Sequence, residues 1–141
     1  MKVYQSKLKI ISGTDCAEVY SGAKNLFLKI KKKSKRKPYI RSVYFGDSKI
    51  FLDYFWEHLH QKHQADRFRR LKFYACAIEL LQNANVLPTI KPHANKPRHL
   101  LYRFLGKTVG GELFAVQVIQ DLKKERKYFL SVFPYEISND K

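Results

Sequence analysis

One stretch of the chain, from Asp47 to Asn85, holds the side chains best suited to chemistry. It reads DSKIFLDYFWEHLHQKH and then QADRFRRLKFYACAIELLQNAN. Tyr54, His58 and Lys62 recur every four residues, so a helix would place them on one face. An imidazole accepts or donates a proton near neutral pH, and a lysine ammonium stabilises negative charge. The spacing therefore predicts a base and a cation that face the same phosphate.

Two arginines and the last third of the chain supply further groups for phosphate chemistry. Metal-free RNA cleavage needs a base for the 2′-hydroxyl, positive charge for the transition state and an acid for the leaving oxygen. Arg70 and Arg103 carry planar forks that fit phosphate oxygens. Ser131 and Tyr128 can donate hydrogen bonds to a nucleotide. Base stacking, which single-stranded RNA recognition requires, could come from Tyr102, Phe104 and Phe129.

The charge of the chain points to a polyanion as partner. Lys and Arg number 28 against 12 Asp and Glu, a formal net charge of +16 in 141 residues. Nucleic acid is favoured as the partner because aromatic residues are interleaved with the basic ones. A membrane surface is less favoured, because the sequence does not predict a long basic amphipathic helix with an apolar opposite side. The residues expected to contact nucleic acid are Lys31, Lys32, Lys33, Lys35, Arg36, Lys37, Lys62, Arg67, Arg69, Lys72, Tyr102, Lys107 and Tyr128.

The run KKKSKRK at residues 31–37 has six basic residues in seven. Such a run is expected on a solvated loop, where it either keeps the protein soluble or contacts phosphates.

No cofactor or metal is expected from the motifs of the chain. The chain has no CxxC, HExxH or Walker pattern, and the spacing of His58, His60 and His63 fits no standard zinc site. Cys16 and Cys76 are expected to be structural free thiols. There is no signal-peptide core and no run of about 18 apolar residues, so we expect a cytoplasmic protein.

The hydrophobic pattern predicts an α+β fold in a single domain, residues 1–141. Two amphipathic helices are expected in the 47–85 stretch, the first capped by Asp47 or Ser48 and the second by Asp66. Trp56 lies on the apolar stripe and is expected in the core. Residues 86–98 are expected to be irregular. The predicted strands are residues 1–12, 26–30, 39–45, 99–105, 112–119 and 127–133.

The last three of these strands favour an antiparallel meander, because their connections are short. The two helices should then pack on one face of an antiparallel sheet of about four to five strands.

Helices followed by an antiparallel meander, in a small basic chain, resemble the barnase–EndoU–colicin–RelE superfamily of ribonucleases. The segments IFLDYFWEHLHQK, DRFRRLKFYACAIELL, YRFLGKT and KYFLSVFP resemble its phage and mobile-element branch. The resemblance covers roughly residues 40–134 and leaves out the lysine-rich run. It implies a metal-independent ribonuclease, often a toxin, with His58, Arg70, Arg103 and Ser131 as its catalytic positions.

The sequence thus predicts an RNA-binding protein that is a metal-independent endoribonuclease. The alternative is a non-catalytic, basic nucleic-acid-binding regulator. A third class is an interaction protein that docks to an acidic partner. For a toxin, that partner would be an acidic antitoxin or immunity protein.

Overall fold

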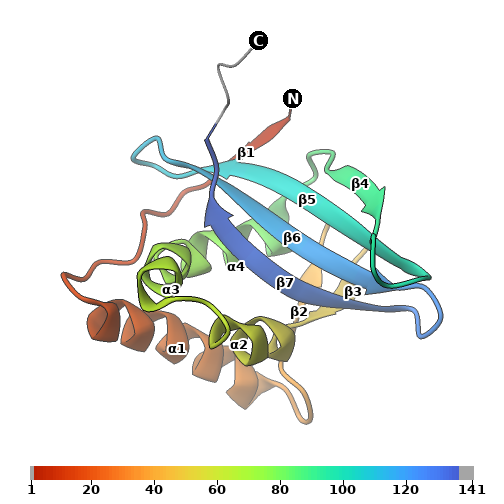
Figure 1. Cartoon of the computed structure of the whole chain (residues 1–141), viewed down its shortest axis with the longest axis horizontal. Helices are drawn as coiled ribbons and strands as arrows, with labels where there is room; N and C mark the ends of the chain where they lie inside the picture. The colour runs from red at the N-terminus through yellow and green to blue at the C-terminus, as the bar shows by residue number, and fades with distance from the viewer. Residues whose placement is uncertain (1, 137–141) are drawn as a thin grey trace.

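Helices and a mixed sheet make up the part of the chain that the computed structural model describes, residues 2–136 (Figure 1). The helices are α1 (Cys16–Lys33), α2 (Asp53–Leu59), α3 (Gln64–Leu71) and α4 (Tyr74–Asn83). The strands are β1 (Val3–Gln5), β2 (Tyr39–Ser42), β3 (Ser48–Phe51), β4 (Thr89–Pro92), β5 (His99–Lys107), β6 (Leu113–Asp121) and β7 (Arg126–Pro134).

The sheet is built around an antiparallel meander, β4–β5–β6–β7. Its strand order is β1-β5-β6-β7-β3-β2, with β4 also paired to β5. Two contacts are parallel: β1 pairs with the end of β5, and β3 pairs with the start of β7. Strand β3 pairs with β7 only at Lys127 and Tyr128. The rest of that edge of β7 has no strand of residues 2–136 beside it and is open to contact with helices.

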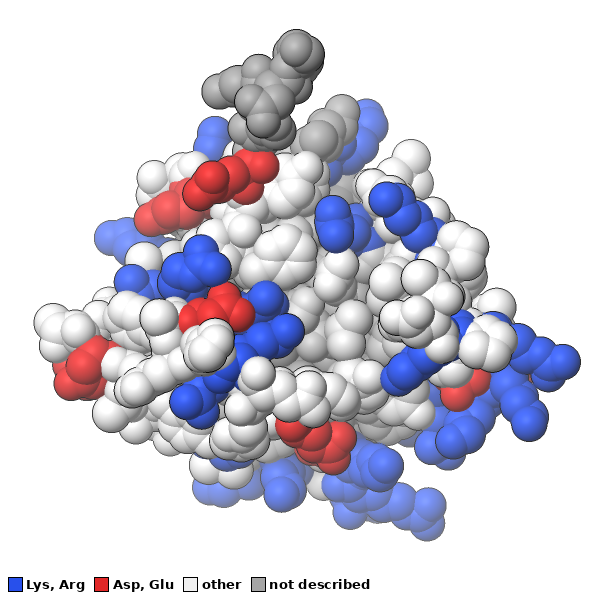
Figure 2. Space-filling model, in the orientation of Figure 1, with Lys and Arg blue, Asp and Glu red and all other residues white. Residues whose placement is uncertain are grey.

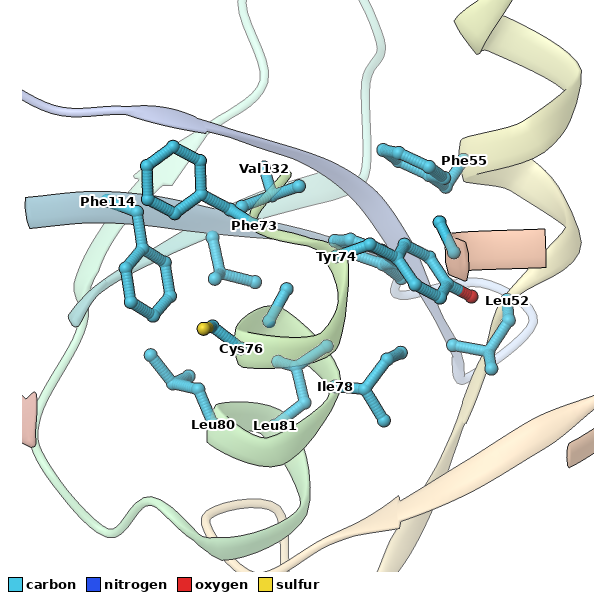
Figure 3. Packing of buried hydrophobic residues seen from close by; sticks show 14 of the residues in the cluster. Leu52, Phe55, Phe73, Tyr74, Cys76, Ile78, Leu80, Leu81, Phe114 and Val132 are labelled. Carbon is cyan, nitrogen blue, oxygen red and sulfur yellow. The ribbon is translucent and has the colours of Figure 1, made fainter. Parts of the chain in front are cut away.

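The core lies between the helices and one face of the sheet. Tyr74, Phe104, Phe114 and Phe129 are among its largest fully buried side chains. Figure 3 shows part of this cluster, in which residues of α4 pack against the sheet. Trp56 is 6% exposed, so the prediction that it belongs to the core is confirmed.

Successive side chains of a strand alternate between the two faces of the sheet. Phe104, Val116 and Val132 belong to the buried cluster. Their neighbours Arg103 and Ser131 therefore lie on the opposite face, which we call the outer face.

The predicted α+β class agrees with the structure in its coarse form, but its details were wrong. Within residues 2–136 there are four helices instead of two, and the sheet has seven strands and is partly parallel. The ends of the predicted domain, residue 1 and residues 137–141, lie outside the described residues.

Helix α1 takes the place of one strand that the sequence predicted. Residues 26–30, predicted as a strand, lie inside α1. Asp15 caps this helix by accepting a hydrogen bond from the Glu18 amide at 2.9 Å. Val19, Ala23 and Phe27 are buried at a helical spacing of four. The run at 31–37 is a loop only from Ser34 onward, because its first three lysines form the last turn of α1, where positive charge is favourable.

The 47–85 stretch also divides differently from the prediction. A tight turn with positive φ at Gly46 and Asp47 joins β2 to β3, so the first helix begins at Asp53 and neither Asp47 nor Ser48 caps it. The second predicted helix breaks at Lys72 and Phe73 into α3 and α4. Asp66 lies inside α3 and forms ion pairs instead of a cap.

Two further segments differ in extent. The predicted strand at 1–12 is ordered as a strand only over Val3–Gln5, and the segment predicted to be irregular contains β4. The three last predicted strands are confirmed with slightly longer bounds as β5, β6 and β7. No helix within residues 2–136 combines the length and apolarity needed to cross a membrane.

Candidate active site

A hollow of about 220 Å³ opens on the outer face, where α2 and α3 meet the free edge of β7. A smaller recess, formed with Phe55 and Leu59, adjoins it. We call the two together the His58 groove. The side chains that line the larger hollow are His58, Gln61, Lys62, Arg70, Gln117, Leu130, Ser131 and Phe133.

An irregularity in β7 places Ser131 in this groove. Val118 pairs with Phe129 but Gln117 pairs with Ser131, so Leu130 is an extra residue, a β-bulge. The bulge brings Ser131 to the outer face, where its hydroxyl donates to Gln117 Oε1 at 3.0 Å. Ser131 is half-buried there and lines the groove.

The orientation of His58 is fixed by its own helix. Its Nδ1 lies 2.9 Å from the carbonyl oxygen of Tyr54. A carbonyl oxygen only accepts hydrogen bonds, so this contact requires a proton on Nδ1. In the neutral ring Nε2 then carries the free lone pair. The imidazole also stacks on Tyr54, with centroids 4.0 Å apart. His58 is therefore held ready to accept a proton at Nε2.

Arg70 is held between α3 and β7. Its Nε donates to Asp66 Oδ2 at 2.9 Å, and its Nη1 donates to the Val132 carbonyl at 3.4 Å. The same carboxylate also binds Arg69 at 3.0 Å. Burial works to raise the pKa of Asp66, but the hydrogen bonds from Arg70 and Arg69 outweigh it and hold that pKa below its usual value. The carboxylate therefore stays ionised and keeps Arg70 in place.

Arg103 lies on the outer face of β5, one strand beyond Gln117 of the groove. Strand pairing aligns Thr89, Arg103, Gln117 and Ser131 in one row over β4, β5, β6 and β7. Arg103 and Gln117 line a second hollow of about 50 Å³, which adjoins the groove through Gln117. The guanidinium carbons of Arg70 and Arg103 lie 5.5 Å and 5.7 Å from the centre of the Phe133 ring.

The four predicted catalytic residues thus lie on a single surface although they are far apart in the sequence. His58, Arg70 and Ser131 line the groove itself, and Arg103 flanks it. Lys62, predicted to face the same phosphate as His58, also lines the groove, although α2 ends before it.

Other residues predicted to bind nucleic acid are distributed over several surfaces. Lys33, Lys35, Arg36 and Lys37 line a separate hollow, and Lys31 and Lys32 are exposed beside it on α1. Arg69 and Lys107 are exposed. Lys72 lies over the Phe68 ring, and Arg67 lines a hollow with Cys16 and Tyr20. Figure 2 shows Lys and Arg side chains around much of the visible face and Asp and Glu in a few small groups.

Three aromatic residues predicted to stack on bases do not reach this surface. Phe104 and Phe129 are 1% and 0% exposed and belong to the core. Tyr102 lies on the same face of the sheet as Phe104, and its ring packs against Tyr44 and Phe45. Its hydroxyl donates a hydrogen bond to Gln120 Oε1 at 2.6 Å. Desolvation, followed by the nearby Tyr44, raises the pKa of Tyr102. The prediction that Phe104 and Phe129 contact bases was wrong, because their strand positions face the core. The prediction for Tyr102 stays untested.

Sequence reasoning missed Gln117 and Phe133. Both lie on the outer face beside Ser131. The alternation of apolar and polar side chains along β6 and β7 was the pattern in the sequence that could have indicated them. The strand register and the bulge at Leu130 were needed to place them.

Cys76 is buried and Cys16 is half-buried, and both are free thiols as predicted. Within residues 2–136 no three His, Cys, Asp or Glu side chains gather in a way that could hold a metal ion. Comparison with known proteins adds no relative: no protein-family model, curated protein or solved structure matches the chain significantly.

Proposed function

We propose that this protein is an RNA-binding, metal-independent endoribonuclease whose active site is the His58 groove. The observation that carries the proposal is the gathering of His58, Lys62, Arg70 and Ser131 around one hollow, with the His58 lone pair on Nε2. These groups provide a proton acceptor, two cations and a hydroxyl donor, the set that phosphodiester transfer requires.

In the proposed reaction the ribose 2′-oxygen attacks the adjacent phosphorus. His58 Nε2 takes the 2′-hydroxyl proton as the bond from oxygen to phosphorus forms. The bond from phosphorus to the 5′-oxygen breaks, and the Lys62 ammonium gives that oxygen a proton. Arg70 donates hydrogen bonds to the non-bridging oxygens, on which negative charge grows. Ser131 joins it when its hydroxyl turns from Gln117 Oε1 to the phosphate. The products are a 2′,3′-cyclic phosphate and a free 5′-hydroxyl, and the charges of His58 and Lys62 are reset by exchange with water.

The order of elements supports the same proposal. Helices α2, α3 and α4 precede the four-stranded antiparallel meander β4–β5–β6–β7. That order is the basis of the resemblance to the barnase–EndoU–colicin–RelE ribonucleases. As further parts of the proposal, the protein acts in the cytoplasm and has an acidic antitoxin as protein partner.

A non-catalytic nucleic-acid binder is the second candidate. The observation that favours it is the lysine-rich hollow of about 730 Å³ at the end of α1, because it offers positive charge with no His58-like base among its lining residues.

The deciding experiment is RNA cleavage by the purified protein in excess EDTA, with His58→Ala and Ser131→Ala beside it. The matched control is His60→Ala, because His60 is exposed at the end of α2 and does not line the groove. Loss of a general base costs about 10²- to 10⁴-fold in rate. The proposal predicts such a loss for His58→Ala, a smaller one for Ser131→Ala and none for the control. Tight, salt-sensitive RNA binding without cleavage would favour the second candidate.

A further inference from the structure

A line of partly exposed rings leads away from the His58 groove. The rings of Tyr39, Phe51, Tyr128, Tyr54 and His58 follow one another in this order. Their centroids are 6.3, 6.0, 5.9 and 4.0 Å apart along the line. Tyr39, Phe51 and Tyr54 come from β2, β3 and α2, and Tyr128 comes from β7. We call this line the ring track.

Strand pairing explains why the rings share one face. Tyr39 pairs with Phe51, and Phe51 pairs with Tyr128, across three adjacent strands. Their neighbours Ile50 and Phe129 point into the core and are fully buried. The first four rings of the track are half-buried, and none of them belongs to the core cluster. Part of each of these residues is therefore exposed on the outer face.

The far end of the ring track opens into the large basic hollow. This hollow, about 730 Å³ in volume, is lined by Lys33, Lys35, Arg36, Lys37, Tyr39, Lys49, Phe51 and Arg126. Tyr39 and Phe51 thus belong to the ring track and to the hollow. Lys49 Nζ lies 4.6 Å from the centre of the Tyr39 ring.

A lysine also lies beside the middle of the ring track. Lys96 Nζ lies 3.2 Å from the Tyr54 hydroxyl, to which it donates. Cross-strand aromatic pairs also stabilise a sheet, but that role needs no cations around them. Rings that stack on bases beside cations that hold phosphates form the usual combination for binding single-stranded nucleic acid.

We propose that the ring track and the basic hollow bind a single-stranded segment of RNA that extends from the His58 groove. The bases of this segment stack on Phe51 and Tyr128, and its phosphates contact Lys35, Arg36 and Lys37. The inference rests on the proposed function, because it takes the His58 groove as the place where the same strand is cut. It assigns a role to the lysine-rich run and selects single-stranded over double-stranded RNA, since a duplex hides the base faces.

The test measures binding separately from cleavage. A fluorescent oligonucleotide of about 12 nucleotides, a length within the usual site sizes for single strands, carries 2′-O-methyl groups so that it cannot be cut. Fluorescence anisotropy gives its affinity as a single strand and as a duplex. The first variant combines Phe51→Leu with Tyr128→Leu, which removes two rings and keeps apolar side chains on the strands.

A second variant keeps the test valid if the ring variant is poorly folded. It combines K35A, R36A and K37A, three exposed positions in the loop after α1. Its matched control combines K2A, K7A and K9A, which removes the same charge at the opposite edge of the sheet, near β1.

The proposal predicts about tenfold weaker single-strand binding by the ring variant, since base stacking on an aromatic ring contributes strongly to affinity, with duplex binding unchanged. Loss of three phosphate contacts lowers the slope of log K against log salt by about 2. The control triple variant should retain most of that slope. Native affinity for the single strand in both the ring variant and the loop variant would overturn the proposal.

Cleavage of an RNA dinucleotide, which has one cleavable bond and no further strand to extend into the hollow, separates this inference from the proposed function. The loop variant should cut it at the native rate. A native protein that cuts no RNA, combined with the predicted binding changes, would overturn the ribonuclease proposal and support the track.

Discussion

Replacing Asp66 with asparagine should separate the positioning of Arg70 from the binding of RNA. The carboxylate joins two arginines, one of them in the His58 groove. The Arg70 and Asp66 side chains are only 17% and 25% exposed, whereas Arg69 is 61% exposed. We assign about 1 kcal/mol to the better-shielded pair and about 0.3 kcal/mol to the other, at the upper and lower parts of the range for such pairs. The expected loss of unfolding free energy is about 1.3 kcal/mol, which lowers the Tm by about 4 °C.

The pH dependence of this loss follows from the lowered pKa of Asp66. A carboxyl group whose pKa is lower in the folded protein contributes stability above its unfolded pKa, and that contribution disappears as the pH falls through the folded value. The difference in Tm between the native protein and Asp66→Asn should be complete at neutral pH. It should shrink as the pH falls below about 4, the ordinary range of an aspartate, and vanish once Asp66 is protonated.

The same variant should affect turnover more than affinity. Without the carboxylate the Arg70 guanidinium loses its charged Nε partner. We expect kcat for RNA cleavage to fall by about tenfold, less than the roughly 10²- to 10³-fold loss from complete removal of such a group. RNA binding should not weaken, because the variant removes a negative charge from a basic surface.

Differential scanning calorimetry over a pH series and steady-state cleavage kinetics measure these effects. Glu57→Gln is the control, because Glu57 is exposed on α2 and its replacement removes the same charge. A Tm difference that stays constant into acid would refute the ion-pair argument. An unchanged kcat would refute the role given to Asp66 in holding Arg70.

Two further predictions concern the core, and thermal unfolding measures both. Gly106→Ala should lower the free energy of unfolding by about 1–3 kcal/mol. The new Cβ would clash with the Phe114 ring and lie 2.9 Å from Leu80 Cδ1. A Tm equal to that of the unchanged protein would show that this region repacks freely. Tyr74→Phe should cost about 1–2 kcal/mol, because it removes the hydroxyl that accepts the buried Trp56 Nε1 hydrogen bond at 3.3 Å. An unchanged Tm in that variant would mean that Trp56 finds another acceptor.

The sequence predicted the residues that gather at the groove better than the helices and strands around them. Tyr54 and His58 share a helical face because a four-residue spacing needs only local geometry, and the stacked rings agree with it. Arg70 and Ser131 come to the groove through contacts between distant segments. Their residue types suggested a phosphate site, but only the pairing of β6 with β7 shows where Ser131 lies.

The errors arose where local patterns fit two structures. LFLKI at residues 26–30 is apolar enough for a strand, but the spacing of Val19, Ala23 and Phe27 makes it helical. Phe51 has the spacing of an apolar helix face with Phe55 and Leu59, and it fits the end of a short strand equally well. The positive φ at Gly46 and Asp47 closes a hairpin and decides for the strand. Phe104 and Phe129 were assigned to bases because strand alternation alone does not tell which face is the core.

In the proposed function, the His58 groove cuts RNA by attack of the 2′-hydroxyl. The most direct test compares one RNA with its 2′-O-methyl counterpart, each incubated with the native protein in excess EDTA. Only the RNA should be cut, and its new ends should be a 2′,3′-cyclic phosphate and a 5′-hydroxyl. Equal cleavage of both strands, or no cleavage of either, would contradict it.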